Sequence, residues 1–401
     1  MRVVITHTDL RLYWPSRILA LQQALESRGD ELYTIEIAGT GSHYAFHDHA
    51  STGIKHWICL FPHTRMEDIS PARAFIRLQK KLDEVAPDII MAGAIAYPSG
   101  AAAVYWAKKN HRPVVIFDDI RPENVPRNTL VNYIKKLIYA QVDAVLCPAP
   151  PWTAAFQYWD FRPQQIFFGV NVVDNAFWSK CDAQTPPPDG MAEWPDPFFL
   201  VVSRQIPAKN LLFLLEVYEM YQRTAGRRCL PLVIVGEGPQ RKIIEHFVRD
   251  KGLEHVHLFP FVSPEKLRVF YHHAAALVLP SILETWGLVV NEAMAAGLPV
   301  LVSKTCGCAS VLVQENINGY TFYPDRPDQL LAAMLFHTNK SNVERAAMAR
   351  ASKRIIQPWG LDQFVKGSMH ALDYALANRK TCRSLRARWV LRSWKGRYRP
   401  I

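Results

Sequence analysis

The 401-residue sequence contains no apolar run of the ~18–20 residues that are needed to span a lipid bilayer. Its first residues form a strand-like apolar segment followed by charged residues, which does not resemble a secretory signal peptide. Cysteines are few, seven in the whole chain and odd in number, so no disulfide framework is expected and a reducing compartment is favoured. We therefore expect a cytoplasmic protein that is soluble or bound peripherally to the cytoplasmic face of a membrane.

Two common binding motifs are also missing. The turn at residues 6–16, between the first expected strand and helix, lacks the glycines of a dinucleotide fingerprint, which argues against tightly held NAD. His43, His47 and His49 lie close together, but their spacing matches no standard set of metal ligands. We interpret their segment as a polar loop rather than a metal cluster.

Acidic residues are absent from the C-terminal segment 379–401, where much of the net charge of +11 is located. Trp389, Trp394 and Tyr398 are interleaved with its Lys and Arg residues. Such a segment can bind an anionic membrane surface or nucleic acid electrostatically, or it can be a solvated basic tail. No motif that reads nucleic acid accompanies it, so we expect no nucleic-acid partner and keep the membrane and the solvated tail as alternatives.

Short apolar runs alternate with amphipathic segments, which predicts an α/β fold with parallel sheets covered on both faces. The pattern restarts at residue 198, after a Pro-rich stretch that is the clearest domain boundary. At ~100–200 residues per domain, the length also favours two domains. Strands of the first half are expected at residues 3–6, 32–37, 56–61, 88–92, 114–118, 144–147 and 165–168.

One strand–helix–strand unit, residues 276–303, carries two acidic residues where ligands of parallel sheets gather. Glu284 lies in the loop after its first strand, and Glu292 lies in the helix expected at 286–296. Gly287, near the start of that helix, would let backbone N–H groups such as that of Leu288 approach an anion. From spacing alone the simpler interpretation is preferred, in which Glu284 balances the helix dipole and Glu292 is solvated.

Two basic residues follow the strand expected at 198–202. Arg204 and Lys209 precede a helix, so both cations and the helix N-terminus could hold a diphosphate, although two exposed basic side chains are the alternative. Gly236 and Gly238 form a Gly-x-Gly turn after the next strand, and this turn either borders a ligand or only packs.

The first half offers one candidate, at the end of the strand 114–118. Asp118 and Asp119 close that strand at the edge where ligands gather. Asp119 is interpreted either as a carboxylate that binds a substrate hydroxyl or as a capping acid beside a surface loop, and both alternatives stay open.

The string PSILETWGLVVNEAMAAGLPVLVS, residues 280–303, favours the functional interpretation of Glu284 and Glu292 over the simpler one. It closely resembles the nucleotide-sugar signature of the retaining glycosyltransferases of family 4, also called the group 1 transferases. In that signature Pro-Ser is followed by Glu, an aromatic residue, Gly-Leu, Glu-Ala-Met-Ala and Gly-Leu-Pro-Val. The trio Arg204, Lys209 and Asn210 is similar to the phosphate-binding motif of the family. The resemblance is strong from residue 198 to residue 319 and loose before it.

The resemblance implies the GT-B architecture, with two Rossmann-like doubly wound domains that face each other across a cleft. It places an acceptor-side domain at 1–180, a Pro-rich linker at 181–197, a nucleotide-sugar domain at 198–358, a closing helix that crosses back at 359–378, and a basic tail at 379–401.

The resemblance further implies transfer of a hexosyl group from an NDP-sugar, linked to UDP or GDP, to an acceptor hydroxyl. The anomeric configuration is expected to be retained, without a divalent metal or another cofactor. The implied roles are diphosphate binding by Arg204, Lys209 and the amides near Gly287 and Leu288, a donor-side turn at Gly236 and Gly238, donor-sugar contacts by Glu284, ribose contacts by Glu292, and an acceptor contact by Asp119.

Two other functions are compatible with the same sequence. An NDP-sugar 2-epimerase of GT-B architecture would need acid and base groups but no acceptor, and a non-catalytic GT-B subunit would bind without turnover. For a transferase, the basic tail favours an envelope polysaccharide or a glycolipid as the acceptor.

Overall fold

The structure is a computed structural model of the whole chain. It describes residues 1–11, 13–39, 53–125, 127–180, 197–382 and 384–397. The three histidines of the predicted polar loop, the predicted linker except Pro197, and Tyr398 lie outside the described residues.

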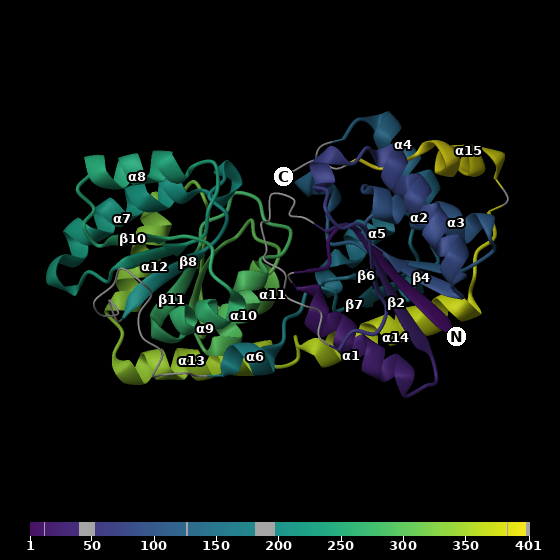
Figure 1. The fold of residues 1–401 in the computed structure, drawn as a ribbon. Coiled ribbons are helices and arrows are strands. Elements are labelled where there is room, and N and C mark those ends of the chain that lie inside the picture. The colour runs from purple at the N-terminus through teal and green to yellow at the C-terminus, as the bar shows by residue number, and fades with distance from the viewer. Residues whose placement is uncertain (12, 40–52, 126, 181–196, 383, 398–401) are drawn as a thin grey trace. The chain divides into compact units, whose positions relative to one another are not determined.

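The chain divides into two compact units (Figure 1). Unit 1 consists of Met1–Val173 and Leu361–Ile401, and unit 2 consists of Asp174–Gly360. The chain therefore leaves unit 1 once and returns to it, so that both termini belong to unit 1.

The described part of unit 1 contains one sheet of seven parallel strands in the order β3-β2-β1-β4-β5-β6-β7. The first strand lies near the middle of the sheet. Strands β2 and β3 are added on one side of it and β4 to β7 on the other, as in doubly wound folds. The strands are β1 (Arg2–His7), β2 (Glu31–Ala38), β3 (Trp57–Phe61), β4 (Ile89–Ala92), β5 (Val114–Phe117), β6 (Ala144–Cys147) and β7 (Ile166–Phe168).

Helices cover both faces of this sheet (Figure 1). Helices α1 and α14 pack together on one face, and α2 and α3 pack together on the other, where α15 contacts α3 and α4. The described helices of unit 1 are α1 (Trp14–Glu26), α2 (Pro71–Val85), α3 (Pro98–Lys109), α4 (Thr129–Tyr139), α5 (Thr153–Tyr158), α14 (Leu361–Ala377) and α15 (Leu385–Ser393).

Unit 2 repeats the design with a sheet of six parallel strands among its described residues, in the order β10-β9-β8-β11-β12-β13. The strands are β8 (Phe198–Val202), β9 (Leu232–Val235), β10 (Val256–Phe259), β11 (Ala274–Leu279), β12 (Val300–Ser303) and β13 (Gly319–Phe322). The helices are α6 (Asn175–Ser179), α7 (Leu211–Ala225), α8 (Arg241–Asp250), α9 (Pro264–His273), α10 (Leu288–Ala296), α11 (Ala309–Leu312), α12 (Pro327–Thr338) and α13 (Asn342–Ile356).

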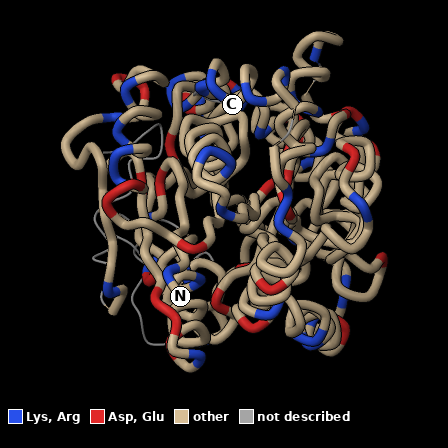
Figure 2. Tube along the Cα trace, turned by 90° about the vertical axis from the view of Figure 1, so that its right-hand side faces the viewer, with Lys and Arg blue, Asp and Glu red and all other residues tan. Residues whose placement is uncertain are grey.

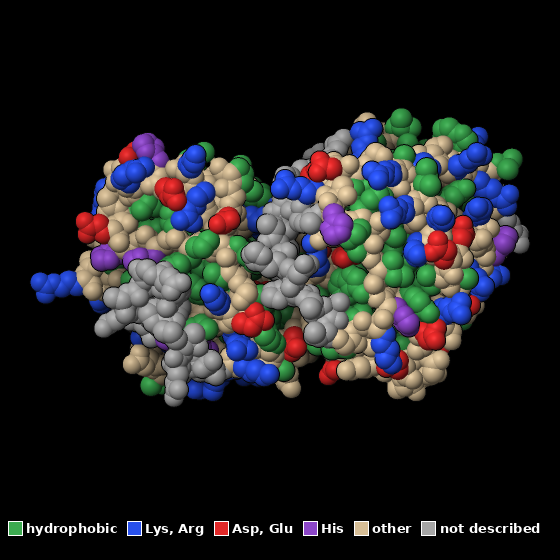
Figure 3. Space-filling view, in the orientation of Figure 1, with side chains coloured by type: hydrophobic (Ala, Val, Ile, Leu, Met, Phe, Trp, Pro, Cys, Tyr) green, Lys and Arg blue, Asp and Glu red, His purple; other side chains and the backbone are tan. Residues whose placement is uncertain are grey.

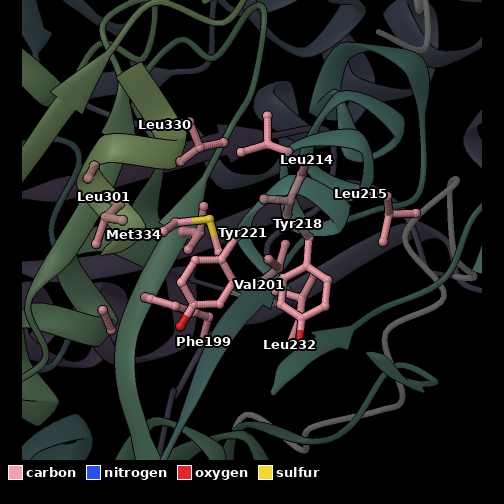
Figure 4. Packing of buried hydrophobic residues seen from close by; sticks show 14 of the residues in the cluster. Phe199, Val201, Leu214, Leu215, Tyr218, Tyr221, Leu232, Leu301, Leu330 and Met334 are labelled. Carbon is pink, nitrogen blue, oxygen red and sulfur yellow. The ribbon is translucent and has the colours of Figure 1, made fainter. Parts of the chain in front are cut away.

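A hydrophobic core of unit 2 lies between one face of its sheet and helices α7 and α12 (Figure 4). Phe199 and Val201 on β8 point toward Leu214 and Tyr218 on α7, and all four side chains are fully buried. Each such side chain contributes ~1.5–3 kcal/mol by leaving water. Phe199 and Val201 are two residues apart and therefore lie on the same face of the sheet, because successive side chains of a strand point to opposite faces.

The α/β prediction is confirmed, and the structure differs from the predicted elements in two places. The helix expected from Trp286 begins at Leu288, because Gly287 adopts a left-handed conformation with φ +106°. The expected basic tail contains a helix, α15, whose inner side chains Ala387, Val390 and Leu391 are buried against unit 1. Within the described residues, no helix is both long and apolar enough to cross a membrane, and the six cysteines present are free thiols.

A buried carboxylate joins the C-terminal segment to the body of unit 1. Asp143 accepts hydrogen bonds from Lys108 Nζ at 2.6 Å, from the backbone N–H of Val114 at 2.7 Å and from the backbone N–H of Lys380 at 2.6 Å. The side chains of Asp143 and Lys108 are 0% and 3% exposed. Burial raises the pKa of Asp143 despite the neighbouring lysine ammonium.

Removal of this carboxylate should destabilise unit 1 strongly. Asp143→Ala leaves the Lys108 ammonium buried without its counter-ion, so we expect a loss of about 3–5 kcal/mol. Urea unfolding followed by circular dichroism measures the loss. Asp373→Ala, which breaks the exposed pair with Arg28, is the control and should cost less than ~1 kcal/mol. Equal midpoints for the two variants would contradict this account of Asp143.

Candidate functional site

The loop after β8 carries the two predicted cations of unit 2. Lys209 ends a 3₁₀ turn, Pro207–Lys209, and Asn210 follows in the left-handed conformation before α7 begins. The Asn210 side chain donates to the carbonyl of Pro324 at 2.9 Å. The backbone N–H of Ile282 donates to the carbonyl of Ala208 at 2.9 Å, so the loop is held by the segments on both of its sides.

The Gly-x-Gly turn after β9 packs directly on this loop. A Cβ at Gly236 would lie 2.1 Å from the carbonyl oxygen of Ser203, and one at Gly238 would lie 2.5 Å from that of Gln205. The buried Gln205 side chain donates to the carbonyl of Gly236 at 2.7 Å. The two glycines therefore allow a close approach of backbones that fixes the segment containing Arg204.

Glu284 lies beyond the end of β11, where its backbone forms a parallel bridge with Cys306. The Glu284 carboxylate accepts a hydrogen bond from Lys209 Nζ, and the two side chains are 19% and 16% exposed. The carbonyl of Glu284 accepts from the backbone N–H of Gly307 at 3.0 Å. The structure thus brings together Lys209 and Glu284, which are 75 residues apart in the sequence.

The start of α10 adjoins these groups. Gly287 is the N-cap of the helix, and a Cβ there would lie 3.0 Å from a Leu279 methyl and 3.3 Å from the Cys308 sulfur. The first amides of a helix, here from Leu288 onward, have no acceptor within the helix and carry partial positive charge. The buried Trp286 supports this turn by donating from Nε1 to the Asn291 side chain at 2.8 Å.

Glu292 lies one turn further along α10 and is only 2% exposed, so it is not a solvated surface position. Its carboxylate accepts a hydrogen bond of 2.6 Å from the hydroxyl of Tyr271, which is fully buried on α9. Sequence reasoning missed Tyr271, because an isolated tyrosine in an amphipathic helix carries no local signal of a carboxylate partner.

The two cysteines that follow β12 are buried beside Glu284. Burial, with a contribution from the Glu284 carboxylate, raises the pKa of the Cys306 thiol, and burial raises that of Cys308 well above its usual value. Neutral thiols are weak nucleophiles and weak metal ligands. Among the described residues, no group of three His, Cys, Asp or Glu side chains is arranged to hold a metal ion.

In unit 1, the structure places the predicted Asp119 directly after β5 and Asp118. The Asp119 carboxylate accepts a hydrogen bond from the Asn171 side chain at 3.2 Å, while Asp118 accepts from the hydroxyl of Tyr139 at 2.6 Å. Asp119 also lies near Arg17, a buried residue of α1. Burial lowers the pKa of Arg17 to about 10, and the negative charge of Asp119 opposes that shift.

Arg17 and Asn171 were missed by sequence reasoning. Arg17 donates from Nε and Nη2 to the carbonyl of Val172, at 3.0 and 2.6 Å, and so fixes the segment that carries Asn171. The three groups come from α1, from the loop after β5 and from the segment after β7. Only the folded sheet brings such distant residues together, so the sequence around each of them contains no signal.

The predicted residues thus fall into two groups. Asp119 lies in unit 1. The others lie in unit 2 along neighbouring loops: Arg204, Lys209, Gly236, Gly238, Glu284, Gly287, Leu288 and Glu292. Strands β9, β8, β11 and β12 are adjacent, so the loops at their carboxyl ends meet at one edge of the sheet.

Comparison with solved structures identifies the fold. HepE of Anabaena, determined in complex with UDP-glucose, superposes with a TM-score of 0.70 at 16% identity over 93% of this chain and 99% of that chain. The chain therefore has the GT-B fold, as predicted.

Comparison of sequences then identifies the family that the C-terminal half resembles. Residues 192–354 match the model of the family described as Glycosyl transferases group 1. The uncharacterized glycosyltransferase MJ1607 of Methanocaldococcus jannaschii is 28% identical over 178 residues, which cover 44% of this chain and 45% of that protein. The O-antigen chain mannosyltransferase C of Escherichia coli is 25% identical over 240 residues, which cover 57% and 60%. The predicted resemblance to group 1 is confirmed, and the matches span about half the length of these relatives.

The close approach at Gly236 can be tested without any ligand. Gly236→Ala places a methyl group against the Ser203 carbonyl, so we expect about 1–3 kcal/mol of destabilisation and faster amide exchange in residues 203–210. Hydrogen exchange read by mass spectrometry measures both effects. Gly252→Ala is the control, because Gly252 also has a positive φ but has open space around it. If both variants exchange alike in residues 203–210, the turn does not hold the loop.

Proposed function

We propose that this chain is a retaining hexosyltransferase that moves a sugar from an NDP-sugar to an acceptor hydroxyl, in the synthesis of an envelope polysaccharide or a glycolipid. The observation that carries the proposal is the pairing of Lys209 with Glu284 beside the start of α10, inside the segment that matches the group 1 model. The experiment that tests it is a transfer assay on variants of the two cations.

The proposed chemistry follows from where charge develops. Cleavage of the bond between the anomeric carbon and the diphosphate leaves negative charge on the departing nucleotide. Lys209, Arg204 and the first amides of α10 would stabilise that charge, because cations and helix N-termini favour anions. We propose that these groups act without a divalent metal. Turnover that disappears in EDTA and returns only with Mg²⁺ would contradict this part.

The Glu284 carboxylate has two effects in this proposal. It fixes the Lys209 ammonium, whose three protons can be shared between the carboxylate and a phosphate oxygen. Its remaining acceptor positions would bind hydroxyls of the donor sugar. Glu292, oriented by Tyr271, would accept from the ribose.

For the acceptor we propose Asp119. The Arg17 guanidinium lies near this carboxylate, and Asn171 donates a hydrogen bond that orients it. An ionised carboxylate accepts hydrogen bonds through both oxygens, so it can bind the acceptor hydroxyl.

The nucleotide is proposed to be UDP or GDP. HepE, a neighbour in fold, was determined with UDP-glucose, and the mannosyltransferase relative acts on an O-antigen chain. The two alternatives are an NDP-sugar 2-epimerase and a non-catalytic GT-B subunit. Product analysis with an NDP-sugar alone separates them, because the epimerase changes the sugar while it stays on the nucleotide.

Removal of either cation should reduce transfer and leave the fold intact. For Arg204→Ala and Lys209→Ala we expect kcat to fall about 10²–10³-fold, because each variant loses one group that stabilises the developing charge. A coupled assay of released nucleoside diphosphate measures the rate. The matched controls are Arg249→Ala and Lys242→Ala, which remove exposed basic side chains of α8 in the same unit.

The controls should retain full activity and should keep the unfolding midpoint of the parent within about 2 °C, which corresponds to ~0.5 kcal/mol. Lys209→Ala leaves the Glu284 carboxylate without its cation, so its midpoint should fall further, while its circular-dichroism spectrum should stay that of the folded parent. Near-normal turnover in both site variants would remove the proposed mechanism.

A further inference from the structure

Helix α15 exposes apolar side chains on its outer face. Leu385 is 78% exposed and Trp389 is 70% exposed, although the same helix buries Ala387, Val390 and Leu391 on its inner face. Residues four positions apart lie on one side of a helix, so Leu385 and Trp389 form one apolar stripe. A basic segment that is only solvated does not require two large apolar side chains exposed side by side.

The neighbouring helix α4 extends this stripe. Leu130 is 66% exposed and Tyr133 is 49% exposed, and α4 packs against α15. Figure 3 shows hydrophobic side chains (green) with Lys and Arg (blue) beside them along the upper rim over α4 and α15. An open groove of about 410 Å³ runs between the two helices, lined by Tyr133, Leu137, Leu385, Arg386, Trp389 and Val390.

Arginines flank the apolar stripe on α15. At ~100° per residue, Arg386 lies on one side of the stripe, and Arg388 and Arg392 lie on the other. The sequence contains no Asp or Glu after Asp373. Elsewhere on the side of the molecule shown in Figure 2, basic (blue) and acidic (red) residues are interspersed along the trace. The α15 face is therefore both apolar and uniformly cationic.

This face is held rigidly on unit 1. Trp394 donates from Nε1 to the carbonyl of Ile95 at 2.7 Å, and the backbone N–H of Arg397 donates to the carbonyl of Ala96 at 2.7 Å. Before the helix begins, the backbone N–H of Lys380 donates a hydrogen bond to the Asp143 carboxylate. Hydrogen bonds before and after α15 thus fix which side of the helix faces outward.

We propose that α4 and α15 form a docking surface for a membrane that contains anionic lipids. Leu385, Trp389 and Leu130 enter the interfacial region, and the flanking arginines bind lipid phosphates. The proposal goes beyond glycosyl transfer, and it names a surface of both helices rather than a basic tail.

The charge of this face argues for lipid over other occupants. A symmetric dimer would place the arginines of one copy against those of the other, because both copies use the same patch. Binding of a nucleic acid backbone would neutralise the arginines but would leave Leu385 and Leu130 in water. An anionic bilayer satisfies the apolar and the cationic groups together.

Flotation of the full chain with vesicles tests the proposal. We expect binding to vesicles of equal parts phosphatidylglycerol and phosphatidylcholine, and none to pure phosphatidylcholine. Arg386→Ala combined with Arg392→Ala should weaken partitioning about thirtyfold, from ~1 kcal/mol for each charge near the surface. Leu385→Ser combined with Trp389→Ser should abolish binding. The matched controls are Lys242→Ala with Arg249→Ala, and Ile243→Ser with Val343→Ser, all at exposed positions of unit 2.

Both control pairs should bind vesicles like the parent chain. The proposal is overturned if the parent fails to bind anionic vesicles, if it binds phosphatidylcholine equally well, or if the Leu385 and Trp389 variant binds like the parent. It is also overturned if the parent chain forms a dimer or binds RNA and the Leu385 and Trp389 variant loses that dimer or that RNA. A thermal-shift measurement with UDP and GDP on the same variants keeps this result separate from the proposed transferase activity, because the substitutions lie in unit 1 and the proposed diphosphate-binding residues belong to unit 2.

Discussion

The contact between Lys209 and Glu284 is the interaction on which the candidate site depends. It joins the loop after β8 to the loop after β11, and the backbone bond from Ile282 to Ala208 reinforces the same junction. Both side chains are largely buried, so their attraction is screened less by water than that of a surface pair. The loops are thereby fixed beside the start of α10, where an anion is favoured.

The parallel sheet explains why these loops meet. Strands β9, β8, β11 and β12 are neighbours, so four loops at their carboxyl ends form one row. Gly236 and Gly238 allow the first loop to pack on the second, and the bridge between Glu284 and Cys306 joins the third to the fourth. A change in any one loop therefore acts on its neighbours through backbone contacts.

Much of this could be predicted from the sequence, because strand patterns and the string at 280–303 are local signals. The α/β class, most strand positions and the segment that matches group 1 transferases follow from such signals. Partners from distant elements could not be predicted. Tyr271 beside Glu292, and Arg17 and Asn171 beside Asp119, become neighbours only through sheet order and helix packing. Helix α15 was missed because its high charge obscured the buried positions Ala387, Val390 and Leu391.

The central claim is that unit 2 holds a diphosphate through Lys209 and its neighbours. Titration calorimetry with UDP, GDP and the corresponding nucleosides, on the parent chain and on Lys209→Ala, tests it most directly. The account predicts that one diphosphate binds at least about tenfold more tightly than its nucleoside, a difference of ~1.4 kcal/mol, and that Lys209→Ala removes most of this difference. Equal affinity of diphosphate and nucleoside for the parent chain would contradict it.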